Sequence, residues 1–261
     1  MTAGSRSGRE PLRLDQSLLA RGLVRSRSQA QALILAGEVR VDGVVVTKPA
    51  AVVPPGASLT ATTDHYVSRA AHKLIGALDE LGLELDGGRA LDAGSSTGGF
   101  TQVLLERGCA GVYAVDVGTD QLAASLRADP RVVVHEQTNL RDLTLDHVGG
   151  EPVDLTVADV SFISLTLLVA PLAAVTRPGG RMLLMVKPQF EVGRDRLGRG
   201  GVVRDPALHT EAVEAVLSAA RDCGWHALGA CRSRLPGPAG NQEFFVLLSD
   251  QAPGGPDQTT G

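Results

Sequence analysis

The sequence is short of several residue types, and each shortage excludes a class of protein. Aromatic residues make up only 3% of the 261 residues, so the 43% of hydrophobic residues must build a core mainly from Leu, Val and Ala. The three cysteines, Cys109, Cys223 and Cys231, are scattered and odd in number, which fits neither a disulfide scaffold nor a zinc site. We therefore expect no bound metal and a reducing compartment, the cytoplasm.

Long hydrophobic runs are also missing. A membrane-spanning helix needs about 20 apolar residues, whereas the longest candidate, LTLLVAPLAAV at residues 165–175, is shorter and contains Pro171. The N-terminal MTAGSRSGRE lacks the apolar segment of a signal peptide. We expect a protein that does not interact with membranes, with room for one catalytic domain and a small companion.

Charge is distributed unevenly along the chain. Residues 1–60 hold eight Lys and Arg against four Asp and Glu, whereas residues 61–261 hold 17 against 25. A small basic N-terminal module followed by a larger acidic one indicates a polyanion-binding domain attached to a domain with a different function.

The basic module, residues 11–62, has the pattern of two helices and a hairpin. Apolar residues at helical spacing end at Gly22, which suits a left-handed helix cap. Ser26, followed three residues later by Gln29, is a capping-box pattern that opens a second helix ending at Gly37. The following VRVDGVVV places Asp-Gly between two β-branched triplets, which predicts a two-residue hairpin.

The cations of this module lie around the stretch SRSQAQALILAGEVRVDG. Taken singly, each is adequately explained as a solvated surface residue. The stretch, however, resembles the alpha-L RNA-binding motif of a small-subunit ribosomal protein, pseudouridine synthases and tyrosyl-tRNA synthetases, in which basic side chains meet RNA. Together with a cation just beyond the module, the resemblance implies these RNA-binding residues: Arg13, Arg21, Arg25, Arg27, Arg40, Lys48 and Arg69.

The second module, residues 69–249, follows a polar linker at 63–68 and alternates apolar strands with helical segments. The strands read RALDAG, VYAVDVG, RVVVHE, VDLTVADV and RMLLMVK, which predicts a parallel sheet covered by helices. The closing WHALGACR and QEFFVLL, with no helix between them, predict an antiparallel hairpin at one edge. Residues 1–10 and 250–261 are expected to be disordered.

A glycine-rich turn in LDAGSSTGGFTQVLLERG joins the first strand to a helix, so a ligand can approach the backbone and the helix N-terminus. The glycines at 94, 98 and 99 do not match G-x-G-x-x-G, which disfavours a dehydrogenase, the main rival enzyme. Asp92 at the strand end would repel a pyrophosphate. It suits S-adenosylmethionine, which carries a sulfonium and an amino group beside its carboxylate.

These features predict a class I (Rossmann-like) S-adenosylmethionine-dependent methyltransferase, an α/β fold with a small N-terminal α+β RNA-binding domain. Asp116, after the second strand, is placed to bind the ribose diol. Asn139, past the third strand, is a candidate for the adenine edge, although a loop asparagine is often a simple turn residue. The expected cofactor-binding residues are Asp92, Gly94, Ser95, Ser96, Thr97, Gly98, Gly99, Phe100, Asp116 and Asn139.

Lysine is the scarcest basic residue, with three lysines against 22 arginines. Because arginine effectively cannot lose its proton, lysine remains necessary where a cation must become neutral. Lys187 ends the buried-type strand of RMLLMVKPQF, and Lys73 lies in SRAAHKLIGALDELG. Asp159 ends the fourth strand and Glu243 begins the last. An ordinary ion pair at the sheet edge explains each one singly, but their joint placement at one end of the sheet favours a catalytic centre.

The motifs RAAHKL, LDAGSSTGGFT, VADVSFISL, VKPQFE, GVVRDP and GNQEFF resemble the TlyA (hemolysin A) family. Its members are rRNA 2′-O-methyltransferases with an FtsJ-like catalytic domain behind an RNA-binding domain, and the resemblance covers residues 11–249. It implies S-adenosylmethionine as cofactor and cytidines of 16S and 23S rRNA, on ribosomal subunits, as substrates. The linker departs from the family pattern, because related members carry a tryptophan where Tyr66 stands.

The resemblance also assigns roles to single residues. It places a catalytic Lys-Asp-Lys-Glu tetrad at Lys73, Asp159, Lys187 and Glu243, and it implies that Asp159 and Phe162 lie beside the cofactor near the transferred methyl group. A ribose hydroxyl must lose its proton as it attacks, so Lys187 is the expected base, with the cation Lys73 nearby and with Asp159 and Glu243 orienting the two lysines. The sulfonium supplies the driving force, so no metal is needed.

Two alternatives from other classes remain. The family's hemolysin name suggests a pore-forming protein as an alternative function, but no membrane segment or secretion signal supports this alternative. A non-catalytic RNA-binding factor is disfavoured, because all four tetrad residues and the glycine loop are present. We expect the enzyme to act as a monomer.

Overall fold

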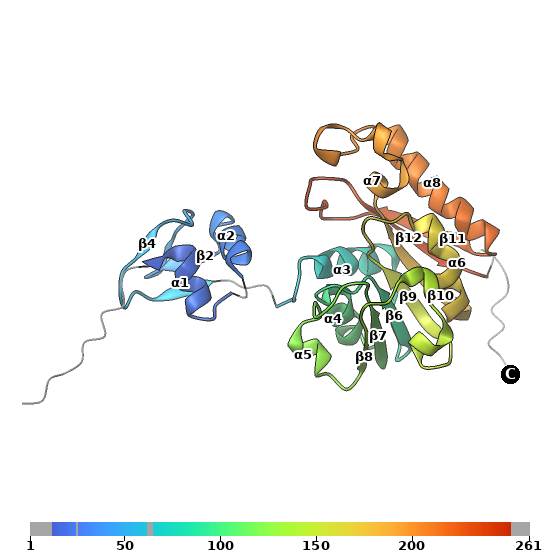
Figure 1. The fold of residues 1–261 in the computed structure, drawn as a ribbon, viewed down its shortest axis with the longest axis horizontal. Helices are drawn as coiled ribbons and strands as arrows, with labels where there is room; N and C mark the ends of the chain where they lie inside the picture. Colours follow the sequence, from blue (N-terminus) through green and yellow to red (C-terminus); the bar gives the residue numbers. More distant parts are fainter. Residues whose placement is uncertain (1–11, 25, 62–64, 252–261) are drawn as a thin grey trace, which may run out of the picture. The chain divides into compact units, whose positions relative to one another are not determined.

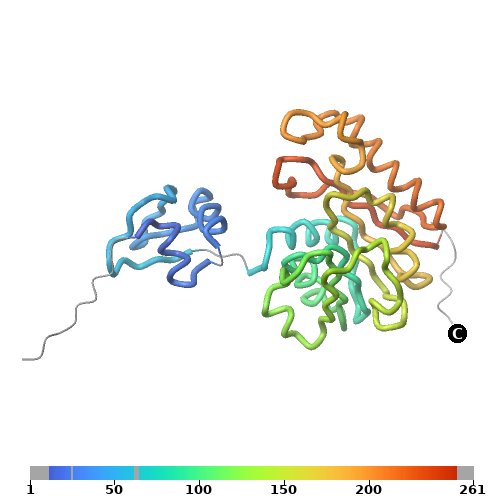
Figure 2. The backbone as a smooth tube through the Cα atoms, in the orientation of Figure 1, coloured from blue at the N-terminus to red at the C-terminus, as the bar shows by residue number. Residues whose placement is uncertain are grey.

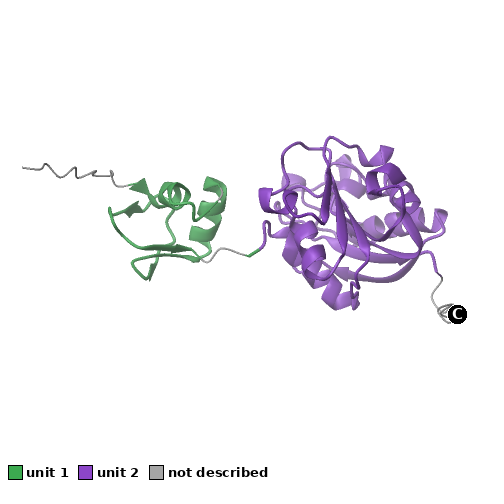
Figure 3. Ribbon diagram, turned by 90° about the horizontal axis from the view of Figure 1, so that it is seen from below, with its two compact units in different colours: residues 1–65 green, residues 66–261 purple. Residues whose placement is uncertain are grey.

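The computed structural model describes residues 12–24, 26–61 and 65–251. They form two compact units that separate between His65 and Tyr66, within the linker expected from the sequence (Figure 3). Each unit has a hydrophobic core of its own.

The N-terminal unit contains the two helices and the hairpin expected from the sequence. Its elements are β1 (Leu12–Arg13), α1 (Leu14–Ala20), α2 (Arg27–Leu35), β2 (Val39–Val41), β3 (Val44–Val45), β4 (Val52–Val53) and β5 (Leu59–Ala61). Ser26 Oγ accepts the N–H of Gln29 at 3.2 Å, which confirms Ser26 as the N-cap of α2. Asp42 and Gly43 both have positive φ, as a tight hairpin turn requires.

Three short strands of this unit were not expected. β5 pairs with β2 to make the sheet β3-β2-β5, and β1 pairs with β4. Strands of two or three residues are too short to show an alternating pattern, so the sequence gives no signal for them.

The C-terminal unit is built on a seven-stranded sheet. Its strands are β6 (Arg89–Ala93), β7 (Gly111–Val115), β8 (Val132–His135), β9 (Val153–Ala158), β10 (Thr176–Val186), β11 (His226–Arg232) and β12 (Phe244–Ser249). They lie in the order β11-β12-β10-β9-β6-β7-β8. β12 runs antiparallel to both β10 and β11, and the other neighbours are parallel, so the expected closing hairpin is confirmed.

Helices cover both faces of this sheet (Figures 1 and 2). One face packs against α3 (Ala70–Leu81), α4 (Gly99–Glu106) and α5 (Ala124–Arg127), and the other against α6 (Val169–Val175) and α8 (Pro206–Asp222). The remaining helical turns are α7 (Pro188–Glu191), η1 (Leu140–Asp142), η2 (Leu145–Val148), η3 (Leu165–Leu167), η4 (Arg194–Arg196) and η5 (Arg199–Gly201). Residues 182–186 of β10 are fully buried and contribute to both cores, because the strand lies inside the sheet.

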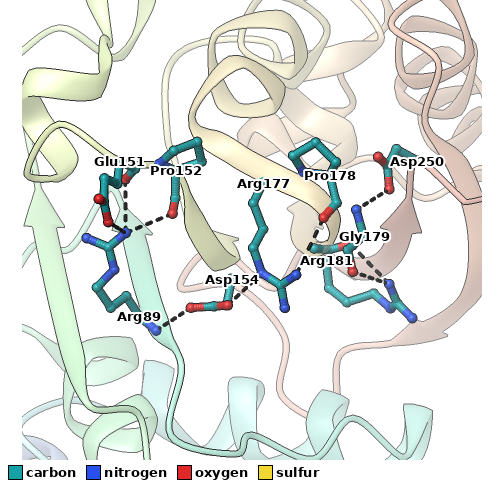
Figure 4. Close-up of polar contacts among 10 residues, drawn as sticks. Arg89, Glu151, Pro152, Asp154, Arg177, Pro178, Gly179, Arg181 and Asp250 are labelled. Atoms are coloured by element: carbon teal, nitrogen blue, oxygen red, sulfur yellow. Dashed lines mark hydrogen bonds and ion pairs between the residues drawn. The ribbon is translucent and has the colours of Figure 1, made fainter. Parts of the chain in front are cut away.

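At the amino ends of the parallel strands, polar groups hold the strands together (Figure 4). The Asp154 carboxylate accepts the backbone N–H of Arg89 at 2.7 Å and Arg177 Nε at 2.6 Å, which links β6, β9 and β10. Asp250 Oδ1 accepts the N–H of Gly179 at 2.9 Å. Asp250 is therefore held in the fold. Residues 1–10 and 252–261, which are expected to be disordered, lie outside the described residues.

None of the described helices is both long enough and apolar enough to cross a membrane.

Candidate active site

The sheet register brings the four candidate catalytic residues to one edge. β9 and β10 are parallel, and Asp159 and Lys187 come directly after them. Glu243 directly precedes β12, which is antiparallel to β10, so it lies at the same edge. Lys73 projects from the first turns of α3, and all four side chains line one cavity of about 260 Å³.

Each lysine of the tetrad pairs with its own carboxylate. Lys73 Nζ lies 2.5 Å from Glu243 Oε2, and Lys187 Nζ lies 2.5 Å from Asp159 Oδ1. Three of the four side chains are at most a tenth exposed, and burying a charge at this depth requires a partner of opposite sign. The tetrad is thus two adjoining ion pairs with no net charge.

Ser161 belongs to the same arrangement and was missed in the sequence. Its Oγ accepts a hydrogen bond from Lys187 Nζ at 2.9 Å, so the lysine is fixed by a hydroxyl as well as by the Asp159 carboxylate. Ser161 lies in VADVSF, two residues after Asp159. No sequence pattern separates such a serine from an ordinary turn residue, so only the structure reveals it.

The glycine-rich loop forms the wall beside the tetrad. A Cβ on Gly94, where φ is 84°, would lie 2.7 Å from the Asp159 carbonyl oxygen, so only glycine fits there. A Cβ on Gly99 would similarly collide with Ser68 Oγ. The loop residues that line the cavity are Gly94, Ser95, Ser96, Thr97, Gly99 and Phe100.

Two predicted cofactor residues do not line the cavities. Gly98 has φ 95° at the start of α4, and a Cβ there would collide with Leu122 and Leu126 of the protein core. Asp92 is fully buried, and its Oδ2 accepts a hydrogen bond from Thr101 Oγ1 at 2.6 Å. Both residues support the loop from the side of the protein core, and the expectation that they contact the cofactor directly stays a prediction.

Asp92 is also electrostatically unusual. Its Oδ1 has no hydrogen-bond partner among the described residues, and burial raises the pKa of the Asp92 carboxyl to about 7.

A second cavity of about 540 Å³ lies beside the first. The two share four lining residues: Gly94, Ser96, Asp159 and Ser161. The predicted residues Asp116, Asn139 and Phe162 line the larger cavity. The Asp116 carboxylate accepts the N–H groups of Ser96 at 2.9 Å and Gly118 at 2.7 Å, which places it at the junction with the glycine loop.

The other two predicted residues of this cavity differ in their environments. Asn139 Oδ1 accepts the N–H of Arg141 at 3.1 Å, so its side chain caps η1 as well as lining the cavity. Phe162 is 92% exposed with a positive φ of 66°, and its ring lies 5.3 Å from that of Phe190. The apolar wall, including Val117, Ile163 and Leu168, was not identified from the sequence.

The joined cavities fit S-adenosylmethionine. The larger one offers a carboxylate and an apolar wall, which suit a ribose diol and an adenine ring. The smaller one offers the backbone of the glycine loop, which suits a carboxylate, and it leads to the tetrad. Gly94 lines both cavities.

The predicted RNA-binding arginines of the N-terminal unit also make contacts within the fold. Asp15 is fully buried and pairs with Arg13 Nε and Arg27 Nη2, each at 3.1 Å. Hydrogen bonds from Arg13, Gln31 and Arg27 hold the pKa of Asp15 well below its usual range, although burial opposes them. Arg13 and Arg27 thus have a structural role that the sequence did not indicate.

The remaining predicted RNA-binding residues lie in several settings. Arg21 Nη1 donates to the Ala57 carbonyl at 2.6 Å, and Arg40 Nη1 donates to that of Gly43 at 3.2 Å. Lys48 is exposed. Arg69 lines the tetrad cavity and donates to the Pro236 carbonyl. Arg25 lies outside the described residues.

Comparisons with known proteins agree with this fold. Residues 66–250 match the model of the FtsJ-like methyltransferases, and residues 12–59 match the S4 domain. The 16S/23S rRNA (cytidine-2′-O)-methyltransferase TlyA of Mycobacterium tuberculosis is 52% identical over 242 residues, covering 92% of this chain and 90% of the relative. The 23S rRNA (cytidine-2′-O)-methyltransferase TlyA of Campylobacter jejuni is 38% identical over 191 residues, 73% of each chain.

A solved structure is similar over both units. A proposed hemolysin from Streptococcus thermophilus is 38% identical, and the match covers 91% of this chain and 88% of that one with a TM-score of 0.73. The chain therefore belongs to the TlyA family, in which an FtsJ-like methyltransferase domain follows an N-terminal S4 RNA-binding domain.

Proposed function

We propose that the protein transfers the methyl group of S-adenosylmethionine to the ribose 2′-hydroxyl of cytidines in 16S and 23S rRNA. One observation carries the proposal: two buried Lys–carboxylate pairs and the glycine-rich loop line one cavity, which joins a second, larger cavity. The 52% identity to an rRNA (cytidine-2′-O)-methyltransferase supports the same substrate.

The cofactor supplies an electrophilic methyl group on a sulfonium when it is bound. Asp116 would hold the ribose hydroxyls, since a carboxylate oxygen can accept more hydrogen bonds than the two N–H contacts it has. Asn139 and the apolar wall would hold the adenine. The loop from Gly94 to Phe100 would hold the amino-acid part, and Phe162 and Asp159 would border the methyl group.

Lys187 is the proposed base. Lys187 would first release the proton of its ammonium group to solvent, and as an amine it would then accept the proton of the 2′-hydroxyl as the oxygen attacks the methyl group. The product ammonium would then be balanced by Asp159 and hydrogen-bonded to Ser161 Oγ, the contacts that Lys187 already makes. The Lys73–Glu243 pair would fix the opposite wall of the cavity and keep it neutral overall.

The N-terminal domain, residues 11–62, would capture the RNA through its exposed cations, and residues 69–249 would carry out the chemistry. Arg40 and Lys48 are exposed and lie in or next to the hairpin. We propose that the protein acts as a monomer in the cytoplasm, where its ribosomal substrate is found.

The test uses ribosomal subunits from a strain that lacks the gene. Incubation with the protein and S-adenosylmethionine, followed by mass spectrometry of rRNA digests, should reveal 2′-O-methylcytidine, with the Lys187→Ala variant as the inactive control. Methylation of a base, or no methylation of either subunit by protein that binds the cofactor, would overturn the proposal.

A further inference from the structure

The segment between α7 and α8, residues 193–204, stands out by its charge. It carries Arg194, Arg196, Arg199 and Arg204. This concentration occurs in a domain whose composition is acidic overall, because residues 61–261 hold 25 acidic and 17 basic residues. We call this segment the arginine loop.

The arginine loop has a defined structure. Its flanking Val192 and its Val203 are buried in the core of the catalytic unit. The N–H of Gly198 donates to the Val202 carbonyl at 3.2 Å, which closes the loop on itself. Arg196 serves the fold, because its Nε donates to the Val192 carbonyl at 2.8 Å and its guanidinium pairs with Glu211.

The other three arginines of the loop make no comparable contacts that stabilise the fold. Arg194, Arg199 and Arg204 are exposed, and within the described part of the chain their guanidinium groups make no hydrogen bond or ion pair. Of the two acidic residues next to them, Asp205 caps α8 by accepting the N–H of Ala207 at 2.9 Å. Three cations therefore face solvent without an ion-pair partner among the described residues, and Asp195 and Asp205 are the acidic residues next to them in the sequence.

Asn241 ties the arginine loop to the catalytic centre. This side chain is 2% exposed, its Oδ1 accepts the N–H of Val203 at 2.9 Å, and its Nδ2 donates to the Gly201 carbonyl at 3.0 Å. Glu243 of the tetrad follows two residues later. In Figures 1 and 2 the orange arginine loop lies beside the red loop that leads into β12, as these bonds require.

We propose that the arginine loop is a second RNA-binding surface, which contacts the phosphodiester backbone beside the nucleotide that enters the tetrad cavity. The inference rests on the proposed function, since it gives the catalytic domain an RNA-binding surface of its own for the same substrate. Guanidinium groups bind phosphate oxygens through paired hydrogen bonds, and such contacts fix register without reading sequence. Captured RNA would thus be positioned for reaction.

RNA fits this surface better than an anionic membrane does. Segments that lie on a membrane combine cations with large exposed apolar side chains. None of the large exposed hydrophobic residues of the described chain lies between 193 and 204. The loop that carries these cations is also bonded, through Asn241, to the segment that leads to Glu243 of the tetrad cavity.

The decisive variant is Arg194→Gln/Arg199→Gln/Arg204→Gln. Its matched control is Arg107→Gln/Arg131→Gln/Arg221→Gln, which removes the same charge from surface pairs with Asp79, Asp129 and Glu214.

Binding of both variants to ribosomal subunits is measured between low and physiological salt. The loop variant should lose about tenfold or more in affinity near physiological salt, and the slope of log affinity against log salt should fall by about two to three. The control should shift either quantity far less.

Two further measurements accompany the binding data. Calorimetry with S-adenosylmethionine should give wild-type affinity for the loop variant, and kcat at saturating RNA should stay within about threefold while KM rises. Single Arg→Gln variants repeat the experiment if the triple variant melts at a lower temperature than the control.

Affinity and salt slope equal to those of the wild type would overturn the inference. So would loop-dependent binding to phosphatidylglycerol vesicles with no loss of RNA affinity. Failure of the proposed function looks different: the wild-type protein would then bind RNA through the loop yet leave ribose unmethylated.

Discussion

Lys187 Nζ lies 2.5 Å from Asp159 Oδ1 and donates a hydrogen bond to Ser161 Oγ, so a charge and a hydroxyl fix this lysine directly after the fully buried residues 182–186 of β10. A lysine that served only the surface would not need this arrangement. Its position in the cavity beside the glycine loop makes the role of a base testable.

Lys187→Arg should keep the positive charge and remove the ability to accept a proton. We expect near-normal binding of S-adenosylmethionine and of ribosomal subunits, but a fall in methyl transfer of about a hundredfold or more. The measurement is single-turnover methylation at saturating cofactor, compared across pH, with Lys48→Arg as the control. Near-wild-type turnover would remove Lys187 from this role and direct attention to Lys73.

Asp92 should make stability depend on pH. Its folded pKa of about 7 lies above the ordinary value of 3.8, so between about pH 4 and 7 the folded protein holds a proton that the unfolded chain releases. The stability that this proton contributes is complete below about pH 4 and is lost as the pH rises through 7.

The variant Asp92→Asn cannot ionise and should lack this dependence. Relative to the wild type, its free energy of unfolding should rise between pH 5 and 7 by up to about 1.4 kcal/mol per pH unit. Urea denaturation without cofactor at several pH values measures the difference. The control is Asp129→Asn, because a hydrogen bond from Arg131 lowers the pKa of Asp129 to about 2, outside this range. Parallel curves for Asp92→Asn and the wild type would contradict the prediction.

In the S4 domain, stability and RNA binding should separate at two cations. Arg27→Ala removes a partner of the fully buried Asp15 and should lower the stability of this domain, by about 1–3 kcal/mol. Lys48→Ala should leave the melting temperature unchanged while weakening subunit binding and reducing its salt slope by about one. Filter binding and thermal melting of both variants test this. Equal melting temperatures for Arg27→Ala and the wild type would mean that the Asp15 pair is dispensable.

The cofactor loop offers a contrast between neighbouring positions. Asp116→Asn replaces an acceptor of two N–H groups by an amide that can accept fewer, so S-adenosylmethionine affinity should fall about tenfold or more. Gly98→Ala should instead destabilise the fold by about 1–3 kcal/mol, because its methyl group meets Leu122 and Leu126. Calorimetry and thermal melting distinguish the two effects. A stable Gly98→Ala protein that has lost the cofactor would show that Gly98 faces the ligand after all.

Most of the secondary structure and the sheet type could be predicted because their signals are local. Alternating strands and helices imply a parallel sheet, and the carboxyl ends of parallel strands meet at one edge. That rule alone places Asp159 and Lys187 together. The short strands β1, β4 and β5 could not be predicted, since two or three residues carry no periodicity.

The sequence by itself determined which residues gather at the carboxyl edge of the sheet, because the succession of strands along the chain and the glycine-rich loop are both recognisable from short local patterns. Only the tertiary structure decided which of them pair. Lys73 and Glu243 are 170 residues apart, and nothing local states that they share an ion pair while Lys187 takes Asp159. The same holds for the burial of Asp92 and for the Asn241 bonds that bring the arginine loop beside Glu243, since pairing and burial depend on contacts between distant segments.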